Sequence, residues 1–418
     1  MKDQRLTNRR SFLKLSAISA SALAIGGGIY SLNRGIRFPM LGLEPRPLPT
    51  EFKSNNGNIG ILSTDIIKLP ESPENVMCFR AFSPEPKFEI TSQEKDFFRI
   101  KVNNISPEAE LVSDDKEIVV EETRSGINRT VTIDLGSAGT ANLEWKLPFT
   151  SDFIFASIGD SGGDKELGWC IERAHQLGAK FLLHLGDFNY QAGDYDRSVA
   201  YFQNSPIPCY ISIGNHDFHE DGHIYPQFLN ELGPLNHSFT IGKTRFVNLD
   251  TAANHFPYGA GKRGDLVESL IAENKAVSDT VVYTHRPLHD PQENSTHDIG
   301  SDGERDWLIE AMSKLECKTM LAGHIHIYDR SEFMGIDHII AGQGLGHQDI
   351  LTKSDYSKMV IGRVNEEGKL SFDTEPLSMP FELHCHPRSN SAKEAREQLE
   401  PKEENKQFID GINKACST

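Results

Sequence analysis

The sequence predicts a protein of the α/β class in which a small all-β, sandwich-like domain precedes a larger domain of alternating strands and helices. Residues 58–150 contain short β-like runs separated by turns and show no long helical period. Residues 151–382 alternate apolar strands with helices, a pattern typical of βαβ units whose sheets are covered on both faces. The 418 residues are 38% hydrophobic and 25% charged, which supports packed cores and excludes global disorder.

The first 35 residues resemble a twin-arginine export signal. Arg-Arg-Ser-Phe-Leu-Lys at 9–14 precedes an uncharged stretch, 15–32, that is rich in Ala, Ser and Gly. An ordinary export signal or a basic helix is the alternative. The resemblance implies the twin-arginine machinery as a partner and a periplasmic or extracellular location. The stretch is long enough to anchor the protein to a membrane if it is not cleaved, and nothing after residue 35 is apolar for as long.

Two further segments flank the predicted domains. Residues 36–57 contain four prolines before residue 50, so we expect a stiff, extended linker there. Residues 383–418 are charge-dense and lack an apolar face, which predicts a solvated tail. Within the β-domain the clearest strands are 97–102, 117–120 and 130–135, and no catalytic group of residues is found among them.

Charge and cysteine content narrow the function classes. The chain has 43 Lys and Arg against 60 Asp and Glu, a formal charge of -17, which repels phosphate backbones and argues against a nucleic-acid binder. The six cysteines have no CxxC spacing. In an exported protein an even number permits disulfides of unassigned pairing, while Cys170, Cys209 and Cys317 lie in apolar segments and also fit small buried hydrophobes.

The larger domain shows a regular order of elements. Apolar runs predict strands at 153–158, 181–185, 209–213, 245–250, 280–283 and 320–322. Helices are predicted at 166–177, 198–203 and 306–314.

Five of these strands end in loops that carry groups able to bind metal ions. The loops are Gly159-Asp160-Ser161-Gly162, Gly186-Asp187-Phe188-Asn189-Tyr190, Gly214-Asn215-His216-Asp217, Thr284-His285-Arg286-Pro287 and Gly323-His324-Ile325-His326. Loops of this kind gather outside the carboxyl ends of the strands. Two carboxylates, a phenol, an amide oxygen and three imidazoles suffice for two metal sites with positions left for water and substrate. A single Gly-Asp pair after a strand usually marks a turn. Five loops with ligand-type residues, each after an apolar strand, indicate a metal site instead.

Residues 152–350 resemble the calcineurin-like metallophosphoesterase family, and within it the purple acid phosphatases. Gly162 stands where other members carry His, Tyr190 follows Asp187 by three positions, and the last motif continues into Tyr328-Asp329-Arg330. The resemblance implies a four-layer-type α/β domain of mixed sheets flanked by helices, behind a β-domain of the kind predicted above.

The resemblance also implies two metal ions. A ferric ion would be held by Asp160, Asp187, Tyr190 and His326. A divalent ion (Fe, Zn or Mn) would be held by Asn215, His285 and His324, with Asp187 bridging the two. The chemistry of the donors agrees, because phenolate and carboxylates are hard anionic donors, whereas imidazoles and an amide oxygen suit a divalent metal. For Tyr190 the alternative is a packed aromatic residue beside the loop.

Substrate contacts follow from the same resemblance. Asn215 and His216 would contact the substrate, and His216 would support proton transfer to the leaving group. His297, in the loop after His285, is our second candidate for this role, with a surface histidine as the alternative. Gly342, Gly344 and Gly346 are expected to form a turn at the rim of the site rather than a nucleotide-binding loop.

Together these inferences predict an exported acid phosphatase that hydrolyses small phosphomonoesters. Two metal ions would activate a water molecule for in-line attack on phosphorus. The first alternative is a metal-dependent phosphodiesterase of the same family, acting on nucleotide or lipid head-group diesters, which needs an open groove for the second ester arm. The second is a non-catalytic binding protein on the same fold, which would be expected to have lost ligands, and none is missing from the sequence.

Overall fold

The structure is a computed structural model that describes residues 50–377 except 55–56, 70–75, 93–96, 115–117, 136–138, 219–223, 253–259, 274, 293–294, 296 and 345–357, together with Lys406, Asp410 and Lys414. The predicted export signal, all of the linker before residue 50, and Cys385 and Cys416 lie outside the described residues, as does the predicted tail apart from those three residues. Among the helices that are described, none combines the length and the apolarity needed to cross a membrane.

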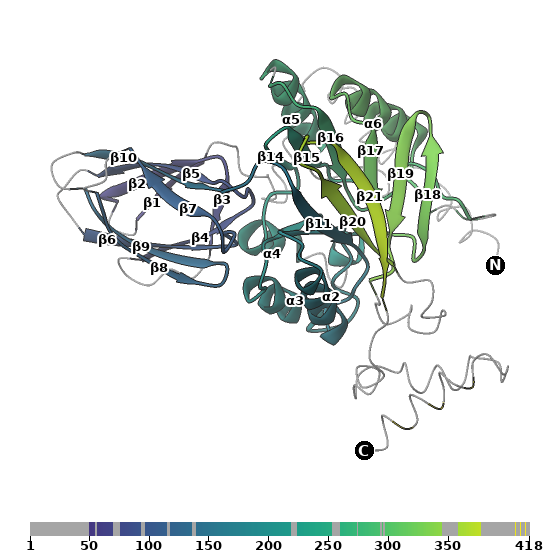
Figure 1. Cartoon of the computed structure of the whole chain (residues 1–418), viewed down its shortest axis with the longest axis horizontal. Helices are drawn as coiled ribbons and strands as arrows, with labels where there is room; N and C mark the ends of the chain where they lie inside the picture. The colour runs from purple at the N-terminus through teal and green to yellow at the C-terminus, as the bar shows by residue number, and fades with distance from the viewer. Residues whose placement is uncertain are drawn as a thin grey trace, which may run out of the picture.

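Two five-stranded sheets pack face to face in the N-terminal part of the described chain (Figure 1). One contains, in spatial order, β1 (Thr50–Lys53), β2 (Ile59–Ser63), β5 (Lys87–Ser92), β10 (Thr140–Lys146) and β7 (Glu110–Ser113). The other contains β3 (Ile66–Lys68), β4 (Val76–Ala81), β6 (Phe97–Asn103), β9 (Asn128–Asp134) and β8 (Val119–Ser125). Alternate residues point inward, so that Phe79, Phe88 and Trp145 stack edge to face in a buried core. The predicted all-β, sandwich-like unit is therefore confirmed.

The rest of the described chain is built around two mixed sheets that face each other. The first contains β13 (Cys209–Ile211), β12 (Leu182–His184), β11 (Phe153–Ile158), β20 (Lys358–Val364) and β21 (Leu370–Pro376). The second contains β14 (His237–Ile241), β15 (Thr244–Asn248), β16 (Asp279–Tyr283), β17 (Thr319–Ala322), β19 (Ile336–Ala341) and β18 (Tyr328–Phe333). Strands β11, β12 and β13 are parallel to one another, as are β15, β16, β17 and β19, and the remaining pairs are antiparallel.

Helices cover the outer face of each sheet (Figure 1). The first sheet carries α2 (Lys165–Gln176), α3 (Asp194–Gln203) and α4 (Ile224–Glu231), and the second carries α5 (Ala260–Ala272) and α6 (Asp302–Lys314). A separate cluster, which includes Phe155, Phe246 and Tyr283, fills the space between the two sheets. Each sheet is thus buried on both faces, and the predicted four-layer α/β arrangement is confirmed.

Some elements differ from the sequence prediction. Strand β1 lies inside the range assigned to a linker, because Phe52 is buried in the sandwich core and residues 50–53 pair with β2. Strand β8 continues to Ser125, well beyond the predicted 117–120, because its polar residues pair with β9. In the α/β part, the strands β14, β18, β19, β20 and β21 and the helices α4 and α5 were not predicted.

The sandwich contacts the first mixed sheet through a few buried polar residues. The side-chain amide of Asn104 accepts a hydrogen bond from the backbone N–H of Cys209 (2.8 Å) and donates one to the carbonyl of Cys209 (3.1 Å). The guanidinium of Arg80 donates to the carbonyls of Cys209 (2.9 Å) and Leu232 (3.2 Å). Cys209 begins β13, so these contacts hold the strand that leads into the loop of Asn215 and His216.

Candidate metal centre

The five loops predicted to carry metal ligands meet between the two sheets, at the carboxyl ends of parallel strands. Asp160 follows β11, Asp187 follows β12, and Asn215 follows β13, all on the first sheet. His285 follows β16 and His324 follows β17 on the second sheet. Because parallel strands end at the same edge, side chains far apart in sequence converge there.

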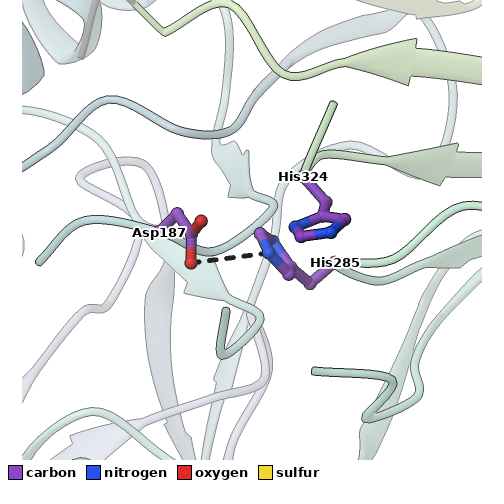
Figure 2. Close-up of side chains that lie close together, drawn as sticks. All are labelled: Asp187, His285 and His324. Carbon is purple, nitrogen blue, oxygen red and sulfur yellow. Dashed lines mark ion pairs between the residues drawn. The ribbon is translucent and has the colours of Figure 1, made fainter. Parts of the chain in front are cut away.

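One group of donors contains Asp187, His285 and His324, whose ligand atoms lie within 4.8 Å of one another (Figure 2). His285 donates from Nδ1 to the carbonyl of Leu185 (2.8 Å), which leaves Nε2 facing Oδ1 of Asp187 at 3.4 Å. Oδ1 of Asn215 lies 2.9 Å from the same Nε2. His324 Nδ1 is buried and has no hydrogen-bond partner in the structure. A buried ring nitrogen without a partner, beside a carboxylate and a second imidazole, fits a divalent cation.

The second group of donors surrounds the hydroxyl of Tyr190. This oxygen lies 3.4 Å from Asp160 Oδ1, 3.4 Å from Asp187 Oδ2 and 3.1 Å from His326 Nε2. His326 Nε2 is in turn 3.5 Å from Asp160 Oδ1. Asp187 belongs to both groups, because its Oδ1 faces His285 and its Oδ2 faces Tyr190. The arrangement offers two adjacent sets of donors that share one carboxylate.

The electrostatics of the two carboxylates reflect their burial. Burial raises the pKa of Asp160, although the hydrogen bond and charge of His326 oppose the shift. Burial also acts to raise the pKa of Asp187, but the charge and hydrogen bond of His285 outweigh it and hold that pKa below its ordinary value. Burial lowers the pKa of His285, yet Asp187 raises it to about 9 overall. The carboxylate of Asp187 and the protonated ring of His285 therefore stabilise each other.

The backbone at the site is held in an unusual conformation. The backbone φ angle is 59° at Asp160, 56° at Asp187 and 68° at His324. These values lie in the left-handed region, which residues other than glycine rarely adopt. A Cβ on Gly214 would stand 2.2 Å from Asp187 Oδ1, and a Cβ on Gly323 would stand 2.6 Å from Asp160 Oδ2. The glycines of these loops therefore let the backbone approach the carboxylates closely.

The two histidines predicted to contact substrate lie at opposite sides of the centre. The ring of His216 is 4.7 Å from the ring of Tyr190, and its backbone N–H donates to Asp187 Oδ1 (2.9 Å). The ring of His297 is 5.6 Å from that of His324 and its side chain is 62% exposed. Ser295 Oγ lies 2.6 Å from His297 Nδ1, and the backbone N–H of His297 donates to Asp290. His297 is thus held at the edge of the metal centre and open to solvent.

The expected turn near Gly342 lies against the site. A Cβ on Gly342 would stand 3.0 Å from Asp160 Oδ2, and one on Gly344 would stand 2.2 Å from the carbonyl of Gly159. Gly346 lies outside the described residues. The part of the turn that is described therefore packs directly on the first loop, as a rim.

Three polar residues that contact the candidate metal centre were given no role in the sequence analysis. Asp217 accepts hydrogen bonds from the backbone N–H groups of Gly214 (2.7 Å), Asp187 (2.9 Å) and Phe188 (3.0 Å). Asp194 accepts from the backbone N–H of Tyr190 (3.0 Å). Arg286 donates to Nε2 of His324 (2.8 Å). Asp217 and Arg286 lie within two of the five predicted ligand loops, and this position could have identified them.

Comparison with known proteins agrees with this geometry. Residues 149–328 match the family model described as calcineurin-like phosphoesterase. This part of the chain is similar to calcineurin-like phosphoesterases. Domains of this family bind two divalent metal ions, and they are metal-dependent phosphoesterases that act on small phosphorylated substrates. No curated protein matched the chain.

Several solved structures resemble this chain at low identity. A purple acid phosphatase from yellow lupin (Lupinus luteus) is 14% identical over 70% of this chain and 70% of its own, with a TM-score of 0.44. A dimetal phosphatase from Danio rerio is 14% identical over 55% and 100%, with a TM-score of 0.40. PhoD is 10% identical over 75% and 88%, with a TM-score of 0.39. These scores are too low to distinguish one activity of the family from another.

Proposed function

We propose that this protein is an exported acid phosphatase of the purple acid phosphatase type that hydrolyses phosphomonoesters. The observation that carries the proposal is the position of the Tyr190 hydroxyl, within 3.4 Å of Asp160, Asp187 and His326. A phenol among two carboxylates and an imidazole is a donor set suited to a ferric ion. The alternative interpretation of Tyr190, a packed aromatic residue, does not account for a hydroxyl turned toward two buried carboxylates.

In this proposal each group of donors holds one metal ion. Asp160, Asp187, Tyr190 and His326 hold the ferric ion; Asn215, His285, His324 and the shared Asp187 hold a divalent Fe, Zn or Mn ion. When bound, the two ions supply positive charge to the phosphoryl oxygens and make water a nucleophile near neutral pH. Asn215 and His216 orient the substrate. His216 and His297 would support proton transfer to the leaving oxygen. His297 is suited to this by its exposed ring at the edge of the centre.

The proposal is tested by the visible absorption spectrum of protein purified from an iron-containing culture, together with its metal content by elemental analysis. We expect a broad visible band and two metal ions per chain. Tyr190→Phe should lose the band. The matched control is Tyr195→Phe, because Tyr195 packs on Phe188 nearby and should leave the band unchanged.

A colourless wild type with two Mn or Zn ions would contradict the ferric–tyrosinate assignment. It would leave a metal-dependent phosphoesterase and favour the phosphodiesterase alternative. A wild type that binds no metal would instead favour a non-catalytic binding protein.

The proposal includes the organisation of the chain and its export. Residues 151–382 would form the catalytic domain behind the β-domain of 58–150, and export would use the arginine pair at 9–10. Replacing both arginines by lysine should retain the protein in the cytoplasm, as measured by cell fractionation. Unchanged export of this variant would point to an ordinary signal.

A further inference from the structure

The buried guanidinium of Arg286 donates its described hydrogen bonds to neutral acceptors. The residue is 6% exposed, and within the described part of the chain it forms no ion pair with a carboxylate, although the charges of Asp187, Glu304 and Asp298 act on it from farther away. Its Nε donates to the carbonyl of Ala252 (3.1 Å) and its Nη1 donates to Nε2 of His324 (2.8 Å). A buried guanidinium without a directly hydrogen-bonded anion is only partly compensated, which suggests that an anion completes its surroundings during function.

The contact between Arg286 and His324 is incompatible with a metal ion on His324. A guanidinium can only donate hydrogen bonds, so it needs the lone pair of Nε2. If the ring binds a metal through Nε2, that lone pair is used. If the ring binds through the unpartnered Nδ1, the other nitrogen carries a proton and is itself a donor. In either case Arg286 must exchange His324 for another acceptor.

The surroundings of Arg286 define that acceptor. Hydrogen bonds from its backbone N–H to Thr251 Oγ1 (2.8 Å) and from Nε to Ala252 fix the side chain beside the metal centre. His324, which it contacts, belongs to the group of metal donors, and the ring of His297 lies 5.6 Å from that of His324. An acceptor reached by Arg286 from this position would also lie beside the cations, and phosphoryl oxygens are acceptors that arginine binds well, often in a bidentate manner.

We infer that Arg286 is a phosphoryl-binding residue that favours dianionic phosphomonoesters over monoanionic diesters. The inference rests on the proposed function, since it assigns the substrate class of the same site. A monoester offers one more anionic oxygen than a diester, and a buried guanidinium binds the more highly charged group more tightly. Arg286 therefore contributes to the proposed preference for monoesters.

The test measures the binding of inorganic phosphate to the metal-loaded protein by titration calorimetry, with metal content determined on the same samples. Arg286→Gln should keep two metal ions and bind phosphate about 10- to 100-fold more weakly, as expected for the loss of a charged hydrogen bond. Arg286→Lys keeps the charge but not the planar guanidinium. Its affinity for phosphate should lie between those of the wild type and Arg286→Gln. The ratio of kcat/KM for a phosphomonoester to that for a phosphodiester, such as p-nitrophenyl phosphate and bis(p-nitrophenyl) phosphate, should fall in the same order.

The control is Arg80→Gln, which also removes a buried guanidinium with neutral partners but contacts none of the metal-centre residues. It should leave phosphate affinity unchanged. The inference is overturned if Arg286→Gln binds phosphate as the wild type does, or if it loses metal, since Arg286 would then act by supporting His324. If Arg286→Gln does not fold, Arg286→Lys decides by the same criterion. A wild type that holds two metals but hydrolyses neither ester would instead overturn the proposed function.

Discussion

At the scale of single residues, the geometry of the metal centre depends on how closely its loops approach one another. Gly323 precedes His324 and leaves room for the carboxylate of Asp160, whose two oxygens share the backbone N–H of His324 in a bifurcated hydrogen bond. A side chain at position 323 would occupy the volume of that carboxylate. The position of the Asp160 carboxylate therefore depends on the absence of a side chain at Gly323.

Gly323→Ala should weaken metal binding. Its Cβ would stand 2.6 Å from Asp160 Oδ2, so the carboxylate must shift, which disturbs its contacts with Tyr190 and His326. We expect a loss of metal affinity of about 10- to 100-fold, the range found when residues supporting metal ligands are changed. Metal titration measures the effect. Gly303→Ala, in α6, is the control because its Cβ meets nothing within 4 Å. Wild-type metal affinity in Gly323→Ala would contradict this account.

The candidate donor residues were chosen because each lies in the loop after an apolar strand and because these loops resemble the motifs of a known family. The structure brings their side chains close together, and their role as metal ligands stays a prediction. Asp217 could not be given its role in the same way. Its carboxylate organises three backbone N–H groups from two loops, and backbone donors have no sequence signal. The same applies to Arg286, whose partner His324 lies in the loop after another strand.

At the scale of elements, a buried ion pair joins the two helices on the second sheet. Arg263 in α5 donates to Glu304 in α6 (2.8 Å) and to the carbonyl of Asp250 (2.6 Å), and its guanidinium lies 4.3 Å from the centre of the Trp307 ring. Both charged side chains are almost fully buried. A pair of this kind depends on both partners, because either charge left alone would be buried without compensation.

Arg263→Met should destabilise the protein by about 3–5 kcal/mol, because Glu304 would keep a buried charge without a partner. The double variant Arg263→Met/Glu304→Leu should recover much of that loss, since it removes both charges. Urea unfolding of the single and double variants measures the difference. If the double variant were as unstable as Arg263→Met, packing rather than charge would explain the loss.

The elements that sequence patterns predicted well are those buried on both faces. Strand β11 was predicted with its observed bounds because residues 153–158 form one apolar run. Strand β21 was missed because half-buried and exposed positions alternate along its polar sequence, and its pairing with β20 is a long-range property. Helix α5 was missed partly because Gly264 interrupts its helical character.

At the scale of the whole molecule, stability depends on histidines that are buried in the neutral form. His237 accepts a hydrogen bond from the hydroxyl of Tyr283 (2.8 Å), and burial lowers the pKa of its ring to about 4. Burial likewise lowers the pKa of His338 to about 4. In the unfolded chain histidine has a pKa near 6.5, so between about pH 6.5 and 4 the unfolded state binds more protons than the folded state.

The contribution of these two histidines to the free energy of unfolding should therefore be fully present above about pH 6.5 and fall as the pH drops toward 4. His237→Gln should reduce this fall, by roughly 2–3 kcal/mol at pH 4, because glutamine does not titrate. Urea unfolding between pH 7.5 and 4, with metal removed by a chelator, isolates the effect from metal release. A wild type and a variant with the same pH dependence would show that His237 does not contribute.

The contact between Asn104 and Cys209 has a further consequence for the behaviour of the chain in solution. Strand β13 is the outermost strand of its sheet, and the amide of Asn104 occupies the N–H and C=O groups of Cys209 that a neighbouring strand would otherwise bind. An open strand of this kind is a template for self-association. The sandwich therefore covers this open edge, and the α/β part without it is expected to precipitate or form oligomers as its concentration rises.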